Sequence, residues 1–222
     1  MKELVNTYSK YFYSKNFSEP GTHASPMDRD LFYEGICEGK FEDLLIEVVQ
    51  IFLFKPNGQV ALQKRSTTKK HNPGLLDKSI GGHITSGQTP KLTVMAETIQ
   101  ELGAAAYVSN DADEFGKMME MLGKHIDTVS LALRVDTVDT FTKKLIDGQK
   151  FMVGNRSHVY FAVYDGALRF KDSEAAGINY FSLEELKEKM KNDPSAFTDD
   201  MHFYLDAYWN RMLDFRKRWL QV

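Results

Sequence analysis

Hydrophobic and polar positions follow two regular patterns along the chain, and each pattern predicts a type of element. The run LLIEVVQIFLF at residues 44–54 is apolar and β-branched, and a PNG turn at 56–58 separates it from a second short run at 59–65. Two such runs around a glycine-containing turn predict a β-hairpin. Residues 67–88 are rich in Gly, Lys, Asn and Ser, which predicts a loop around one short strand.

A helix is predicted over residues 90–102, because both of its ends carry helix signals. Thr89 is a good N-cap, Pro90 fits the first helical position, and Gly103 stands where a glycine commonly ends a helix. Apolar residues recur inside the segment at 3–4–3 spacing, which predicts a buried stripe. The stripe consists of Leu92, Met95, Ile99 and Leu102.

Later segments alternate between the two patterns. Ser182 and Glu185 have the spacing of a capping box, which predicts the start of a helix. Strand runs that alternate with a few helices favour a mixed α/β or α+β domain. The expected segments are part-helical regions at 111–126 and 136–149, a strand within 131–138, a strand at 158–164 and a last amphipathic helix over 201–220.

The patterns divide the chain into two parts. Residues 1–40 mix aromatic and polar residues and include a Pro/Gly/Ser-rich stretch at 19–30. They are expected to form an N-terminal extension with a loop and one short helix. Residues 41–222 are expected to form the main domain, with an insertion around 110–150 and C-terminal helices.

Composition excludes several classes of protein. With 222 residues, 42% apolar and 27% charged, the chain has the content of a soluble globular protein. Its formal net charge of -3 predicts no general basic surface for nucleic acid. No segment approaches the roughly 18 apolar residues of a membrane span, and the start lacks a signal-peptide pattern. Since Cys37 is the single cysteine, a cytoplasmic protein without disulfides is expected.

The candidate catalytic and metal-binding residues lie in and around the predicted helix 90–102. Glu97 and Glu101 are one turn apart and lie about 40° from each other on the helix surface. Two carboxylates at that spacing after a glycine-rich loop suit Mg²⁺ or Mn²⁺, which prefer hard oxygen ligands and bridge phosphate oxygens. Basic residues upstream are candidates for contact with phosphate, although loop solubility would also explain them. These are Lys64, Arg65, Lys69 and Lys70.

The same stretch resembles the signature of the Nudix hydrolases. The upstream segment VALQKRSTTKKHNPGLLDKSIGGHI is similar to Nudix proteins related to isopentenyl-diphosphate isomerase, and NYFSLEELKEKM is similar to their closing helix. The resemblance covers residues 44–108 well and 156–190 loosely. It implies the Nudix fold, a mixed β-sheet sandwiched between helices. The matching positions are Gly82, Gly87, Glu97, Glu101, Gly103 and Ala104.

Several positions depart from the family signature. Gln88 stands where the first glutamate belongs, Ala96 replaces the arginine, Gln100 replaces one of the paired glutamates, and Thr98 replaces an apolar residue. Without the arginine, the ion pair that positions a glutamate is lost, and an amide attracts a cation less than a carboxylate. The resemblance therefore implies one metal held by Glu97 and Glu101, with Gly82 helping through its backbone.

Isomerase chemistry is not expected. The isomerase relatives use a cysteine just before the Gly-Gly-His region and a glutamate on a later strand. Here the first region, residues 79–83, reads SIGGH, and the later strand, residues 155–163, reads NRSHVYFAV. Neither segment contains the required residue.

Two hypotheses from different classes follow. In the first, the chain is a hydrolase that cleaves a nucleoside diphosphate linked to another group, with Glu97 and Glu101 on the metal and Arg65, Lys69, Lys70 and His83 as substrate contacts. In the second, it is a Nudix domain without catalysis that binds a ligand or a protein. An additional acid or base is left open among Glu114, Glu120 and Glu174.

The aromatic-rich helix near the C-terminus has two readings. It is expected to serve as core or as a subunit contact, so that a homodimer is one expected state. Its apolar residues are Phe203, Tyr204, Leu205, Tyr208, Trp209, Met212 and Trp219.

Overall fold

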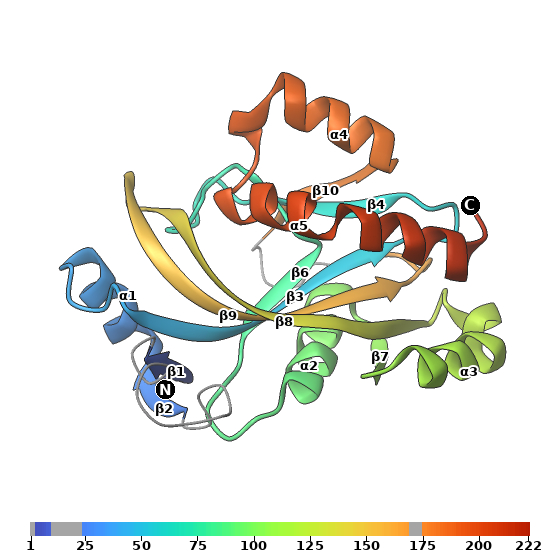
Figure 1. Ribbon diagram of the computed structural model, residues 1–222, viewed down its shortest axis with the longest axis horizontal. Helices are drawn as coiled ribbons and strands as arrows, with labels where there is room; N and C mark the ends of the chain where they lie inside the picture. Colours follow the sequence, from blue (N-terminus) through green and yellow to red (C-terminus); the bar gives the residue numbers. More distant parts are fainter. Residues whose placement is uncertain (1–2, 10–23, 169–174) are drawn as a thin grey trace.

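The computed structural model describes residues 3–9, 24–168 and 175–222. A mixed β-sheet forms its centre, and helices lie on both sides of this sheet (Figure 1). The strands are β1 (Leu4–Ser9), β2 (Ser25–Asp28), β3 (Leu44–Phe54), β4 (Val60–Arg65), β5 (Leu76–Asp77), β6 (Ile80–His83), β7 (Ala105–Ser109), β8 (Val129–Ile146), β9 (Gln149–Val163) and β10 (Ala175–Phe181). The α-helices are α1 (Arg29–Cys37), α2 (Pro90–Leu102), α3 (Ala112–Leu122), α4 (Leu183–Asn192) and α5 (Asp199–Phe215).

The sheet runs in the order β10-β4-β3-β9-β8-β7, with β1 and β6 also pairing with β3, and β5 with β4. Strand pairs β3–β9 and β7–β8 are parallel, whereas the other pairs are antiparallel. The predicted fold, a mixed sheet sandwiched between helices, is therefore confirmed.

Strand β3 is buried on both faces, which explains its nearly continuous apolar sequence. Val49, Ile51 and Leu53 pack into the cluster that contains Val94 of α2. The alternate residues Phe52 and Phe54 pack into the cluster on the other face, beneath α3, α4 and α5. Because successive side chains of a strand point to opposite faces, both faces of a central strand must be apolar.

The segment at 136–149 is extended, so the prediction of partial helix there is wrong. It belongs to a long hairpin in which β8 and β9 pair from Leu131↔Val163 to Ile146↔Gln149. Asp147 and Gly148 form the turn, with φ angles of 47° and 84°. An Asp-Gly pair accepts these left-handed angles, and it is a strong hairpin signal. The helix expected within 111–126 exists as α3.

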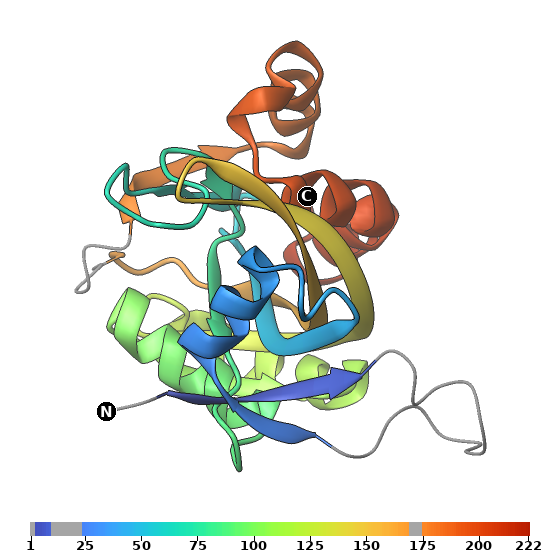
Figure 2. The same ribbon diagram turned by 90° about the vertical axis from the view of Figure 1, so that its left-hand side faces the viewer.

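The N-terminal extension contains the one short helix that was expected, α1, and it also contributes two strands. β1 pairs with β2 and with the beginning of β3. Figure 2 shows these segments, in blue, gathered at one side of the molecule. Phe32, Tyr33 and Ile36 of α1 pack with Ile46 and related residues in a third core cluster. Part of the predicted loop at 19–30 lies outside the described residues.

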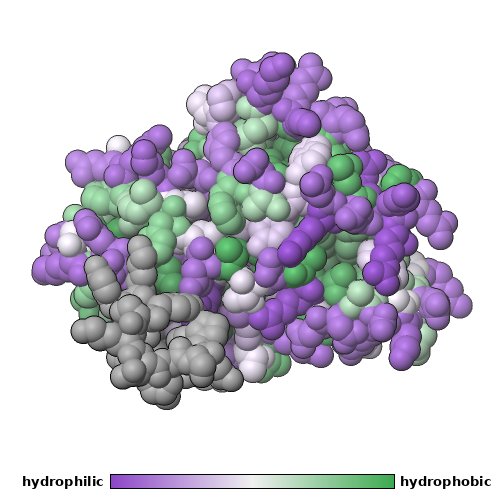
Figure 3. All heavy atoms as spheres, in the orientation of Figure 1, coloured by the Kyte–Doolittle hydropathy of each residue, from purple (hydrophilic) through white to green (hydrophobic). Residues whose placement is uncertain are grey.

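Helix α5 packs its apolar side into the core. Tyr204, Leu205, Tyr208 and Met212 are buried there. Of the two readings of this aromatic helix, the described residues therefore support core. Across the described ranges, no helix is long and apolar enough to cross a membrane. On the face shown in Figure 3, hydrophobic residues appear as separate patches among hydrophilic ones.

Candidate active site

Helix α2 begins and ends where the sequence predicts. The Oγ1 atom of Thr89 accepts a hydrogen bond from the backbone N–H of Leu92 at 3.3 Å, and Pro90 occupies the first turn. Gly103 ends the helix with a φ of 73°, a left-handed conformation that glycine adopts without steric cost. These two ends fix the position of the acidic residues between them.

The buried face of α2 differs from the predicted apolar stripe. Leu92 is 53% exposed and Ile99 is 51% exposed, so the stripe is wrong at both positions. Helix α2 is oriented so that Glu101 points towards the sheet. There Gln63 of β4 donates a hydrogen bond to its carboxylate. The buried residues of α2 are Thr93, Val94, Thr98, Glu101 and Leu102.

Glu97 lies directly against the backbone of Gly82. A Cβ atom built on Gly82 would come within 2.0 Å of the Glu97 Oε1 atom. Only glycine leaves enough space for this approach. The backbone of β6 and the Glu97 carboxylate thus lie directly against each other.

Glu101 is only 3% exposed, and its Oε2 atom accepts a hydrogen bond from Gln63 Nε2 at 3.2 Å. Gln63 lies on β4, so the sheet fixes the orientation of this carboxylate. The amide of Gln63 donates a hydrogen bond without adding charge, and the negative charge of an ionised Glu101 is therefore retained. Sequence reasoning did not identify Gln63.

Three positions that depart from the signature are not buried with Glu101. Gln88 and Gln100 are exposed, and Ala96 is half-buried. The backbone N–H of Gln88 donates to Thr85 in the turn before α2. Within the described part of the chain, no contact therefore supports a role of the Gln88 and Gln100 side chains beside Glu101.

The donor set around α2 fits a single divalent cation. Two carboxylates and a glycine backbone are hard oxygen donors of the type that Mg²⁺ accepts. Among the residues that the structure describes, no group of three or more His, Cys, Asp or Glu side chains could hold a metal ion. Glu97 and Glu101 therefore remain candidates for one ion with few protein ligands.

His83 lies on the same strand as Gly82 but faces the opposite side of the sheet. Its Nε2 atom is 3.0 Å from the hydroxyl of Tyr33 in α1. The ammonium group of Lys144 on β8 donates to that same hydroxyl at 3.1 Å, and the ring of His71 packs on Tyr33 with centroids 4.4 Å apart. Four residues from distant segments thus form one cluster, which we call the Tyr33 cluster.

The two histidines of the Tyr33 cluster are neutral. Burial, together with the positive charges of Lys144 and Arg65, lowers the pKa of His71 to about 3. Burial and the charges of Lys144 and Arg29 lower the pKa of His83 well below its usual range. The positive charge of this cluster is therefore carried by Lys144, while the imidazoles remain available as neutral hydrogen-bonding groups.

Arg65 is already held by the protein. Its Nε atom donates to the backbone carbonyl of His71 at 2.9 Å, and its Nη1 atom lies 3.2 Å from Asp77. Asp77 is buried; burial raises its pKa, but the charges of Lys78 and Arg65 outweigh this effect, so its pKa is lowered. Arg65 thus anchors the loop between β4 and β5 to a buried carboxylate.

The three lysines predicted to contact phosphate lie close to this loop. Lys64 and Lys69 are half-buried, and Lys70 is exposed. The backbone carbonyl of Lys70 accepts a hydrogen bond from Asp147, at the tip of the β8–β9 hairpin. The loop and the hairpin tip are thereby joined beside the Tyr33 cluster.

The candidate extra acids lie apart from Glu97 and Glu101 in the sequence and in the fold. Glu114 accepts a hydrogen bond from Ser109 Oγ at 2.8 Å near the start of α3, and Glu120 is exposed on the same helix. Glu174 lies outside the described residues. Within the described residues, no hydrogen bond or ion pair joins Glu114 or Glu120 to α2.

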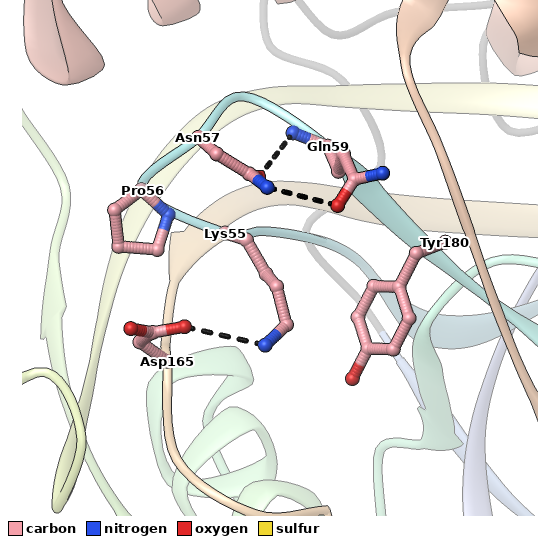
Figure 4. A pocket seen from close by; sticks show the side chains of 6 residues that line it. All are labelled: Lys55, Pro56, Asn57, Gln59, Asp165 and Tyr180. Atoms are coloured by element: carbon pink, nitrogen blue, oxygen red, sulfur yellow. Dashed lines mark hydrogen bonds and ion pairs between the residues drawn. The ribbon is translucent and has the colours of Figure 1, made fainter.

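A shallow hollow of about 370 Å³ lies at the turn between β3 and β4. Figure 4 shows Lys55 between Asp165 and Tyr180, with its ammonium 3.2 Å from the Asp165 carboxylate. This hollow is lined by none of the predicted site residues. Because its cation and carboxylate neutralise each other, it offers less chemistry than the region around Gly82 and His83.

Sequence reasoning missed the partners of His83 for a physical reason. Tyr33, His71 and Lys144 come from a helix, a loop and a strand that are remote in sequence. His71 lies in the KKHNPG segment, which belongs to the stretch that resembles Nudix proteins. This resemblance is the only sequence feature that could have indicated a role for His71. Nothing in the local pattern around Tyr33 or Lys144 indicates that they meet.

The chain is similar to known proteins in sequence and in fold. The profile of the NUDIX domain family matches residues 45–201. The chain is 26% identical over 175 residues to an isopentenyl-diphosphate Delta-isomerase of Burkholderia multivorans, an alignment that covers 78% of this chain and 84% of the relative. It is also 28% identical over 98 residues to an uncharacterized Nudix hydrolase of Listeria innocua, covering 41% of this chain and 58% of the relative.

Among solved structures, the chain is similar to the protein DR0079 of Deinococcus radiodurans. The TM-score is 0.54 and the sequence identity is 17%, and the match covers 90% of this chain and 94% of the other. At this identity the similarity concerns the fold alone.

Proposed function

The chain belongs to the Nudix family, and on that premise we propose that it is a hydrolase. Its substrate would be a nucleoside diphosphate linked to another group, cleaved by metal-assisted attack of water on phosphorus. The observation that supports this proposal best is the contact between Glu97 and the bare backbone of Gly82, with Glu101 one turn further along α2.

Each residue near Gly82 has a proposed role. Glu97 and Glu101 would hold Mg²⁺ or Mn²⁺, and Gly82 would help through its backbone. A bound divalent cation would neutralise phosphate charge and lower the pKa of the attacking water. Gln63 keeps the Glu101 carboxylate oriented through the hydrogen bond at 3.2 Å.

The Tyr33 cluster offers proposed contacts for a phosphate group on the face of the sheet opposite to Glu97. Lys144 offers a positive charge, and among the described residues no carboxylate lies within ion-pair distance of its ammonium group. Neutral His83 offers a ring nitrogen, and Lys69 and Lys70 add charge at the edge. Arg65 would contribute by holding the loop, or by contacting phosphate from its place beside Asp77.

Turnover assays with an isosteric variant test the proposal. We expect the wild-type protein with Mg²⁺ or Mn²⁺ to release nucleoside monophosphate or phosphate from at least one member of a panel. The panel comprises nucleotide sugars, dinucleoside polyphosphates and nucleoside triphosphates. Glu101→Gln should lower kcat at least 100-fold, because it removes a metal-binding charge at constant side-chain shape.

Glu120→Gln is the matched control, since Glu120 is exposed on α3. It should keep wild-type turnover. Equal turnover in wild type and Glu101→Gln would contradict the assignment of the metal to this carboxylate.

A ligand-binding Nudix domain without catalysis is the second candidate. The specific observation in its favour is that the described residues contain no group of three or more potential metal-binding side chains. This candidate predicts no turnover of any panel member. It also predicts that a nucleotide raises the thermal unfolding midpoint equally in wild type and in Glu101→Gln.

The isomerase relatives add one arm to the assay. Isopentenyl diphosphate should not be isomerised, because Gly81 and Gly82 precede His83 without a cysteine and β9 carries no glutamate. Formation of the isomeric diphosphate, followed by NMR, would reverse this conclusion.

A homodimer also remains a proposal. Since the buried side of α5 packs into the core, a contact through this helix would use its exposed side. Light scattering distinguishes the two states, because the monomer has a mass of 25.4 kDa.

A further inference from the structure

We propose that Arg134 and Tyr160 form a binding site for an oxyanion, a carboxylate or phosphate group. The site lies on the α2 side of the sheet and is separate from the place where Glu97 meets Gly82. Gly82 pairs with Val49 on β3, and Val49 pairs with His158 on β9. Two strand spacings, about 10 Å, therefore separate the backbone of Gly82 from the backbone of His158.

A β-bulge brings the residues of this site together. The pairing of β8 with β9 shifts between Arg134 and Asp136, so that Arg134 is opposite Tyr160 and Thr137 is opposite His158. The extra residue allows Arg134 and Thr137 to point to the same face of the sheet. Bulges re-aim side chains in this way, and they are common beside functional sites.

His158 holds the Arg134 guanidinium in place. Its Nε2 atom lies 2.7 Å from Glu47 Oε1, while the other Glu47 oxygen accepts from Asn6 at 2.8 Å. Burial raises the pKa of Glu47, but its hydrogen bonds with His158 and Asn6 outweigh that, so the pKa is lowered and Nε2 donates to a carboxylate. The Nδ1 atom then accepts, from Arg134 Nη2 at 3.1 Å and from Thr137 Oγ1 at 3.0 Å.

Arg134 has no acidic partner among the described residues, whereas Arg156 of the same hairpin and Arg211 of α5 each have one. Arg156 is paired with Asp139 at 2.9 Å, and Arg211 is paired with Asp136 at 2.8 Å. Within the described residues, the hydrogen bonds of Arg134 involve Nη2 only, which leaves the N–H groups of Nε and Nη1 for another acceptor.

The hydroxyl of Tyr160 is the independent indication of a ligand. Tyr160 is 0% exposed, and its hydroxyl has no hydrogen-bond partner among the described residues. Burial raises the pKa of this hydroxyl, and the charge of Arg134 acts to lower it, which indicates that the two groups are close. A buried hydroxyl without a partner requires an explanation, because the great majority of such groups are satisfied.

These observations point to an oxyanion. A structural network of Glu47, His158 and Thr137 would explain the position of the guanidinium. Within the described part of the chain, however, it provides no carboxylate for Arg134 and no hydrogen-bond partner for the hydroxyl of Tyr160. A carboxylate or phosphate would accept hydrogen bonds from both groups and neutralise the charge. Thr137 is exposed and Arg134 is half-buried, so the site opens to solvent at one end.

Thermal unfolding of the full chain with inorganic phosphate and with acetate tests this proposal. Chloride keeps the ionic strength constant. We expect one of the two anions to raise the unfolding midpoint of the wild-type protein, and the stronger of them identifies the class of ligand. Arg134→Gln should require at least tenfold more of that anion for the same rise. Tyr160→Phe should unfold at a higher temperature without anion but gain less from it, because it removes the unpaired hydroxyl.

Two controls keep the result specific. Arg211→Gln, on an arginine with a carboxylate partner, should respond like wild type, and so should Glu101→Gln, which tests the hydrolase separately. Should Arg134→Gln fail to fold, Arg134→Lys replaces it and should show a weakened response. The proposal is overturned if neither anion acts on the wild-type protein. It is also overturned if the response survives in the Arg134 variant and disappears in Lys144→Gln, which would assign the anion to the Tyr33 cluster.

Discussion

At Gly82, the absence of a side chain determines where the Glu97 carboxylate lies. We expect Gly82→Ala to cost about 1 kcal/mol of unfolding free energy, because the new methyl group overlaps the end of a flexible side chain. Urea unfolding measures this cost. In a Glu97→Ala background the same substitution should cost less, since the overlapping atoms are gone. An equal cost in both backgrounds would show that Glu97 does not lie against Gly82.

Protonation at the residue scale predicts a dependence of stability on pH. The pKa of His71 is about 3 in the folded protein, below the usual 6.5, so the unfolded chain binds a proton that the folded chain does not. Above pH 6.5 a buried neutral histidine of this kind therefore costs no unfolding free energy. As the pH decreases from 6.5 towards 3, the unfolding free energy falls by up to ~1.4 kcal/mol per pH unit for each such histidine.

Urea unfolding at pH 7.0 and pH 5.5 measures this effect before most carboxylates titrate. His71→Asn should lose less stability over that interval than the wild-type protein. His125→Asn serves as the control, because His125 is exposed, and it should behave like wild type. An identical pH dependence in all three proteins would contradict burial of a neutral His71.

At the scale of elements, α2 depends on its first turn. Thr89→Ala should lower the unfolding free energy by about 1 kcal/mol, because the N–H of Leu92 loses its side-chain acceptor. Thr89→Ser should keep most of the stability, since serine also caps. Thermal or urea unfolding of the two variants measures the difference, and equal losses would show that the hydroxyl does not cap the helix.

At the scale of the whole molecule, the N-terminal segment is part of the core. Phe32 of α1 is 0% exposed, so Phe32→Ala should cost about 3–5 kcal/mol by leaving a cavity. The neighbouring Leu31 is 51% exposed, and Leu31→Ala should change stability by less than about 0.5 kcal/mol. Urea unfolding compares them, and similar small effects would mean that α1 is an independent appendage.

The sequence by itself determined the elements whose signals are local. The hairpin of β3 and β4, the ends of α2 and the capping box of α4 all depend on residues a few positions apart. The approach of Glu97 to Gly82 also matches the spacing of the family signature. The Asp147-Gly148 turn is an equally local signal, but the sequence before it predicts a partial helix where the structure has a strand.

Only the tertiary structure decided which groups meet across long distances in the chain. The sequence of α2 is compatible with burial of the stripe of Leu92 and Ile99 or of the side that carries Glu101. In the structure the Glu101 side is buried, and Gln63 of β4 donates a hydrogen bond to its carboxylate there. Lys144 and His83 meet at Tyr33 because α1 packs on the sheet. Hydrogen bonds and burial between remote segments depend on the packing of whole elements, and periodicity within one segment carries no information about that packing.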